Sequence, residues 1–142
     1  MRVFFDASVI IAALLSPDGG SAQLFRYVRL GVMVGITSQT VLNEVISKTA
    51  KINKLQNEIE AFIVESKVVV RRRVTKKEIN PYTNLVDAGD AHLIAGAKLT
   101  RCVILVTLDK RHLLRQEIHK KFLPLMIVSP RELLQNYFTK ST

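Results

Sequence analysis

The chain has 142 residues, of which 48% are hydrophobic, and it carries a formal net charge of +9 at neutral pH. This length and apolar content predict a single folded domain over residues 1–142 and exclude an intrinsically disordered chain. The positive charge favours a polyanionic partner, and the alternative is a basic surface without one.

Three further features bear on the class of protein. The apolar stretch up to Leu15 resembles a short signal peptide, but Asp6 interrupts it and no convincing cleavage site follows. No apolar run is long enough to span a bilayer. The single cysteine, Cys102, excludes an internal disulfide framework and is expected in the core. We therefore expect a soluble cytoplasmic protein that does not bind membranes.

Short apolar runs alternate with helical patterns along the whole chain. In the first half we expect a strand at residues 2–5, an apolar segment at 9–15 and a helix capped by Ser21. A strand at 32–36, a helix capped by Thr37 or Ser38, a helix through 55–63 and a strand at 68–70 are expected to follow. In the second half we expect a polar loop through 80–82, a helix at about 88–98, a strand at 103–106, a helix after Asp109, a strand at 125–128 and a helix after Pro130. This alternation predicts an α/β fold with a parallel sheet and right-handed crossovers.

Two acidic residues follow predicted strands. Asp6 ends the first apolar run, and Asp109 comes shortly after the run that ends at Val106. Functional groups of parallel sheets gather at the carboxyl ends of the strands, so we expect these two carboxylates near each other. Glu44 and Asp90 lie on predicted helices that could face them. Asp90 falls within the apolar stripe of its helix, where an ionised carboxylate is costly without compensation.

Each acid also has an ordinary explanation. Asp6, Asp87 and Asp109 could cap helices, with Asp90 as the third helical residue after Asp87, and Glu44 could pair with a lysine four residues later. Taken together these explanations are weaker if the carboxylates lie close to one another. Two like charges about 5 Å apart repel by roughly 3 kcal/mol at an effective dielectric near 20. Converging carboxylates need a counter-charge, and ligands that are all oxygen favour Mg²⁺ or Mn²⁺. Such a site suits phosphodiester hydrolysis.

We expect the histidines to take no part in this site. His92 lies opposite the apolar stripe of its helix, which predicts a solvated side chain. His112 and His119 show no metal-ligand spacing. The predicted site is therefore made of oxygen ligands only.

At these acids the chain resembles the PIN domain family, and particularly short prokaryotic PIN proteins of the VapC-like toxin type. The matching segments are residues 3–10 (VFFDASVI), 41–45 (VLNEV), 87–95 (DAGDAHLIA) and 105–109 (LVTLD), with a similar terminal strand and helix start at 128–133 (VSPREL). No single segment is specific, but their order and spacing hold across essentially the whole chain.

The resemblance implies a three-layer α/β/α sandwich with a five-stranded parallel sheet in the order 3-2-1-4-5. It also implies Mg²⁺- or Mn²⁺-dependent ribonuclease activity and a homodimer. By this resemblance the metal-binding and catalytic acids are Asp6, Glu44, Asp90 and Asp109, the supporting hydroxyls are Ser8 and Thr107, and Asp87 is a less certain supporting acid.

Our leading hypothesis is an endoribonuclease that cuts single-stranded or structured RNA, as the toxin of a toxin–antitoxin pair. Lys110, Arg111 and Arg115 are the candidate phosphate contacts, and Arg71–Arg73 form a second candidate. Tyr82 could stack on a base or pack locally. The alternatives are a catalytically silent RNA- or protein-binding module and a phosphotransfer domain with Asp6 as acceptor, although Asp6 lacks a neighbouring second acid.

Overall fold

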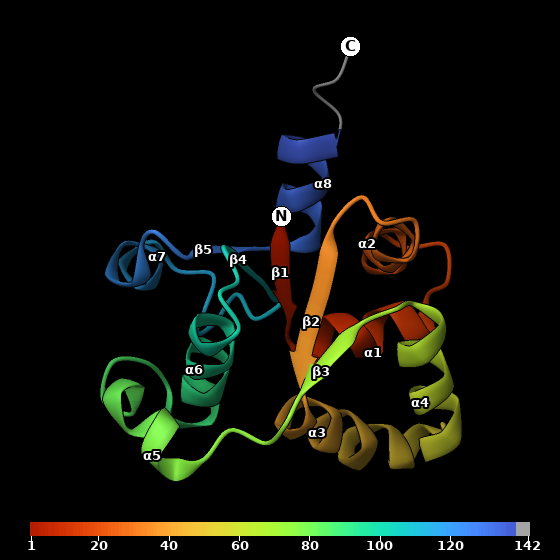
Figure 1. The fold of residues 1–142 in the computed structure, drawn as a ribbon, viewed down its shortest axis with the longest axis horizontal. Coiled ribbons are helices and arrows are strands. Elements are labelled where there is room, and N and C mark those ends of the chain that lie inside the picture. Colours follow the sequence, from red (N-terminus) through yellow and green to blue (C-terminus); the bar gives the residue numbers. More distant parts are fainter. Residues whose placement is uncertain (139–142) are drawn as a thin grey trace.

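A computed structural model describes residues 1–138, apart from the side chain of Ile52. Its centre is a parallel sheet in the order β3-β2-β1-β4-β5. The strands are β1 (Arg2–Phe5), β2 (Val34–Ser38), β3 (Val69–Arg71), β4 (Ile104–Val106) and β5 (Met126–Val128). All five carboxyl ends therefore point to the same edge of the sheet, and β1 and β4 are neighbours there (Figure 1).

Helices cover both faces of this sheet, so the predicted three-layer α/β/α architecture is confirmed. One side carries α1 (Ala7–Leu15), α2 (Gly20–Arg29), α3 (Gln39–Thr49), α4 (Gln56–Glu65) and α8 (Pro130–Phe138). The other side carries α5 (Lys76–Ile79), α6 (Ala91–Leu99) and α7 (Gln116–Phe122). Short 3₁₀ turns lie at Ala50–Ile52, Asn80–Tyr82 and Ala88–Asp90.

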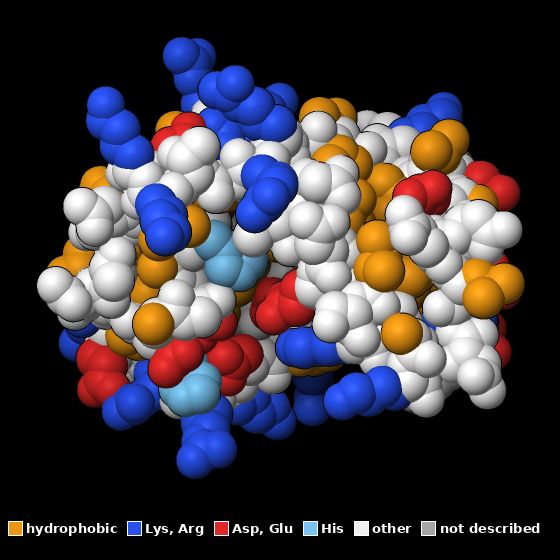
Figure 2. All heavy atoms as spheres, turned by 90° about the horizontal axis from the view of Figure 1, so that it is seen from below, with side chains coloured by type: hydrophobic (Ala, Val, Ile, Leu, Met, Phe, Trp, Pro, Cys, Tyr) orange, Lys and Arg blue, Asp and Glu red, His pale blue; other side chains and the backbone are white. Residues whose placement is uncertain are grey.

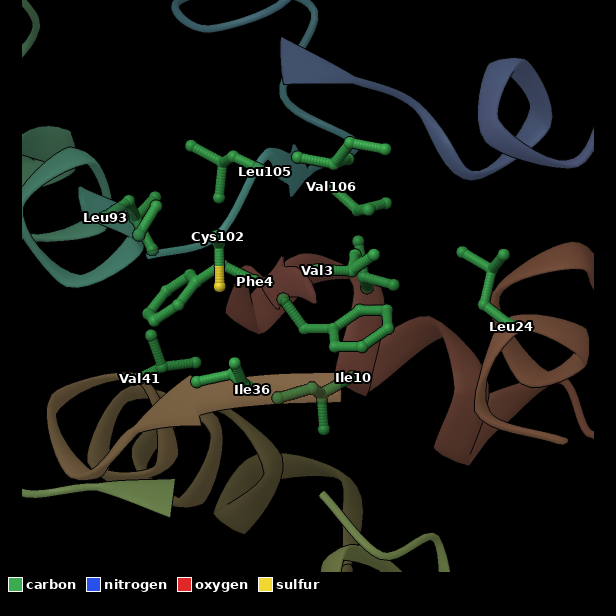
Figure 3. Packing of buried hydrophobic residues seen from close by; sticks show 14 of the residues in the cluster. Val3, Phe4, Ile10, Leu24, Ile36, Val41, Leu93, Cys102, Leu105 and Val106 are labelled. Atoms are coloured by element: carbon green, nitrogen blue, oxygen red, sulfur yellow. The ribbon is translucent and has the colours of Figure 1, made fainter. Parts of the chain in front are cut away.

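The core forms because successive residues of β1 point to opposite faces of the sheet. Phe5 stacks on Phe25 of α2, with ring centroids 4.5 Å apart. Phe4 points the other way, where α6 comes so close that a Cβ atom on Gly96 would meet the phenyl ring at 2.7 Å. Figure 3 shows the strand side chains packed with those of the flanking helices, and Cys102 among them. Cys102 is thus a core residue as predicted, and burial raises the pKa of its thiol.

Three local predictions were wrong. The second helix begins at Gly20 with Gly19 as its N-cap, rather than after Ser21. The expected polar loop at 80–82 is a 3₁₀ turn, and the short helix α5 precedes it, begun by a capping box of Thr75 and Glu78. Turns rather than a helix follow Asp109, and α7 starts only at Gln116. Ser38 does cap α3, since its hydroxyl accepts a hydrogen bond from the amide of Val41 at 3.1 Å.

Within residues 1–138, no helix is long and apolar enough to cross a membrane.

Candidate active site

Asp6 lies at the carboxyl end of β1 and is only 7% exposed. Its Oδ2 atom accepts two hydrogen bonds, from the Ser8 hydroxyl at 3.0 Å and from the Thr107 hydroxyl at 2.7 Å. Thr107 is fully buried and directly follows β4. The two hydroxyls named from the sequence therefore hold Asp6 in one orientation and join β1 to the segment after β4.

Asp109 reaches the same edge through the turn after β4. Its amide donates to the Thr107 hydroxyl at 3.1 Å, and its Oδ1 atom accepts from the amides of Arg111 and His112, both at 3.0 Å. The carboxylate thus caps a turn, whereas its ordinary explanation had it cap a helix. Its Oδ2 atom lies 3.4 Å from Nδ1 of His112.

Asp90 stands at the start of α6 and is half-buried. Its Oδ2 atom is buried and has no hydrogen-bond partner among the described residues. Burial is the main cause that raises the pKa of Asp90 to about 6, and the charges of Asp109, Asp6 and Asp87 raise it further, in that order. These effects place Asp90 in the negative field of the other acids, as the sequence predicted.

Asp87 and His112 form a group with Asp90. Asp87 accepts a hydrogen bond from the Gly89 amide at 3.3 Å, which is the capping role considered for it. Asp87, Asp90 and His112 each offer one atom that could bind a metal ion, and these three atoms lie within 4.8 Å of one another. His112 therefore brings a ring nitrogen close to these acids, beside the oxygen-only ligand set that was expected.

Glu44 lies on α3 and is not part of this group. It pairs with Lys48 at 3.4 Å, as expected for residues four apart on a helix, and its side chain is 36% exposed. Burial lowers the pKa of His92, and the charges of Glu44 and Asp6 act against this effect. The prediction of a solvated His92 was wrong, because its Nδ1 atom is buried.

Basic side chains surround the acids. Figure 2 shows acidic and histidine side chains near the middle of the face that carries the strand ends, with lysines and arginines around them. Lys110, Arg111 and Arg115 are exposed. Lys110 and Arg111 lie in the turn after Asp109, and Arg115 is the N-cap of α7 and pairs with Glu117.

The second candidate for phosphate contacts, the run of arginines at 71–73, is partly engaged within the protein. Arg71 binds Glu78 with a shortest separation of 2.5 Å, so its guanidinium already has an acidic partner within the protein. Tyr82 packs locally, against Phe122 and beneath the ammonium of Lys98.

Comparison with known proteins decides the family. The PIN domain family model matches residues 2–111, which include all four predicted acids. The chain belongs to the PIN domain family. Among solved structures, the PIN domain described here is similar to VapC20 of Mycobacterium tuberculosis, a sarcin–ricin loop cleaving toxin. The TM-score is 0.54 and the identity 17%, over 77% of this chain and 91% of VapC20, which shows a shared fold. A search of curated proteins finds no match.

PIN domains that act as nucleases use divalent metals, and the residues present here fit such an ion. The orphaned, buried Oδ2 atom of Asp90 and the raised pKa of its carboxyl are what a site of converging carboxylates should show without a counter-charge. Asp6, Asp90 and Asp109 would supply oxygen ligands, and Asp87 and His112 lie close enough to Asp90 to join them.

We predict that Asp90→Asn stabilises the metal-free protein at pH 8 but not at pH 4. The ordinary pKa of the carboxyl is 3.8, and the folded value is about 6. Between these values the folded protein holds a proton that the unfolded chain has lost, so wild-type stability falls as pH rises through this window. Asparagine never ionises, so the gain at pH 8 should be on the order of 1–2 kcal/mol after allowance for partial exposure.

Urea unfolding in EDTA at the two pH values measures this difference, with Asp18→Asn at an exposed position as the control. If Asp90→Asn changed the free energy of unfolding equally at both pH values, ionisation of the Asp90 carboxyl would not be what destabilises the folded protein.

Proposed function

We propose that this PIN domain is a Mg²⁺- or Mn²⁺-dependent endoribonuclease. The observation that carries the proposal is the buried, unpartnered oxygen of Asp90 in the field of Asp6 and Asp109. A binding module gains nothing from mutually repelling carboxylates, whereas a metal-dependent nuclease requires them.

Each residue of the proposed site has a distinct role. Asp6, Asp90 and Asp109 hold the ion, and Ser8 and Thr107 fix the orientation of Asp6. Glu44, on α3, orients the attacking water or completes the ligand set. A divalent ion in this site would offset negative charge on the phosphate and make a bound water more acidic. Lys110, Arg111 and Arg115 bind the flanking phosphates of the RNA.

Cleavage of a labelled single-stranded RNA tests the proposal. The wild-type protein should cut it with Mn²⁺ or Mg²⁺, and EDTA should stop the reaction. Binding should weaken as salt rises, because lysine and arginine contacts release counterions from RNA. RNA binding without cleavage under any divalent metal would instead support the catalytically silent module.

The biological role proposed here is that of a cytoplasmic toxin, paired with an antitoxin protein and acting as a homodimer. The likeness to the fold of VapC20, itself a toxin, supports this role. Induced expression should arrest bacterial growth, the antitoxin should restore it, and sedimentation equilibrium should give twice the mass of one chain. Normal growth during expression of an RNA-cutting protein would separate the ribonuclease from the toxin role.

A further inference from the structure

An apolar hollow opens beside Asp109, where α2, α8 and the turn after β4 meet. Its volume is about 460 Å³, and the apolar side chains in its wall are Leu108, Pro130 and Leu134. α2 and α8 approach each other so closely here that a Cβ atom on Gly20 would meet Cδ1 of Leu134 at 3.3 Å. The packed helices therefore form this wall before any ligand binds, as is usual for pockets that take small ligands.

Hydrogen bonds join the hollow to the proposed metal site. Leu108 directly follows Thr107 and directly precedes Asp109. Its amide donates to the Ser8 hydroxyl at 3.1 Å, and that hydroxyl donates to Asp6 at 3.0 Å. The side chain of Leu108 is 41% exposed, so a ligand can reach it. Because neighbouring Cα atoms are only about 3.8 Å apart, a phosphate bound at the acids would bring the adjoining nucleotide to the hollow.

Arg131 also lines the hollow, and the stability of the fold does not explain its position. It lies in the first turn of α8, whereas cations stabilise a helix at its C-terminal end. The acid next to it, Glu132, is engaged elsewhere, since it accepts a hydrogen bond from the Ser129 amide at 3.2 Å. Arg131 is exposed and makes no hydrogen bond or ion pair with any residue that the structure describes. The described residues that line the hollow include no acid, so this guanidinium is available to a ligand.

An apolar wall with one planar cation fits a base of single-stranded RNA. Unstacked bases are bound by stacking on aromatic rings or on the guanidinium plane of an arginine, and Arg131 supplies such a plane. We propose that the hollow is a subsite for one nucleobase of the RNA, next to the phosphate held at the metal site. Leu108 and Leu134 contact the base, and Arg131 stacks on it. This inference rests on the proposed function, because it takes the acids as the place of cleavage.

The test compares a short labelled single-stranded RNA with an abasic RNA of the same length, in EDTA so that neither is cut. Both carry the same phosphates, so the ratio of their dissociation constants, measured by fluorescence anisotropy, isolates the contribution of the bases. The wild-type protein should prefer the RNA with bases by about tenfold, the scale of stacking on one base.

Three variants and a control locate this preference. Arg131→Ala and Leu108→Ser should each remove most of it, and Arg131→Lys, which keeps the charge but not the plane, should not restore it. Arg29→Ala loses the same charge at the exposed far end of α2 and should keep the preference. In methyl NMR spectra, the Leu108 and Leu134 signals should shift with the RNA but not with its abasic counterpart.

The outcomes separate the two claims. A wild-type protein that cuts RNA but binds the two RNAs equally, or an Arg131→Ala variant that keeps the full preference, would overturn the subsite while the proposed function stands. A base preference that Arg131→Ala abolishes, in a protein that cuts no RNA under any divalent metal, would support the subsite and overturn the proposed function. The three substituted side chains are exposed, so the variants should fold, and circular dichroism checks this.

Discussion

Asp90→Asn should reduce metal-dependent RNA cleavage by roughly 100- to 1,000-fold, the scale on which loss of one charge-stabilising group slows an enzyme. The carboxyl of Asp90 stands in the field of three other acids, so neutralising it removes a ligand from the centre of the proposed site. RNA affinity should stay the same or rise, because one negative charge fewer repels the phosphates.

Single-turnover cleavage and filter binding of the same RNA measure the two effects separately. Asp18→Asn is a matched control, since Asp18 is an exposed aspartate in the turn between α1 and α2. A folded Asp90→Asn protein that cuts RNA within a few-fold of the wild-type rate would remove Asp90 from the catalytic site.

Mn²⁺ should raise the melting temperature of the wild-type protein by roughly 5–10 °C at 100 times its dissociation constant. A ligand that binds only the folded state contributes about 2.7 kcal/mol at that concentration. Asp6→Asn should remove most of this rise, because Asp6 is the acid held most firmly at the strand ends.

Asparagine is the substitution of choice at this position. Its side-chain oxygen can still accept the Ser8 and Thr107 hydrogen bonds, so the metal-free protein should keep its fold. Differential scanning fluorimetry with and without Mn²⁺ measures the shift, and Asp18→Asn should respond as the wild type does. An undiminished rise in Asp6→Asn would place the bound Mn²⁺ elsewhere on the molecule.

The fold was predictable because its signals are local and repeated. Each strand is a short apolar run, and each run is followed by a helical pattern, which is sufficient for a parallel α/β sheet. The strand order came from the resemblance to PIN domains and is confirmed. Asp6 and Asp109 follow the neighbouring strands β1 and β4, as expected, whereas Asp90 is the N-cap of α6 and precedes the helix that was expected to carry it.

The positions of His92 and His112 were not predictable from the local sequence, because they depend on contacts distant in sequence. A helical projection assigns His92 to the side opposite the apolar stripe, yet its Nδ1 atom is buried in the fold. His112 joins the acids because a turn, rather than the expected helix, follows Asp109. A carboxylate that accepts amides two and three residues later is the local signal for such a turn.

Crystals grown with Mn²⁺ would test the central claim, that carboxylates from distant parts of the chain share one cation site. The measurement is an anomalous difference map at the manganese absorption edge. We expect a peak in direct contact with carboxylate oxygens of Asp6, Asp90 and Asp109, with Glu44 facing it. A map with no peak at these residues, from crystals saturated with Mn²⁺, would contradict the account.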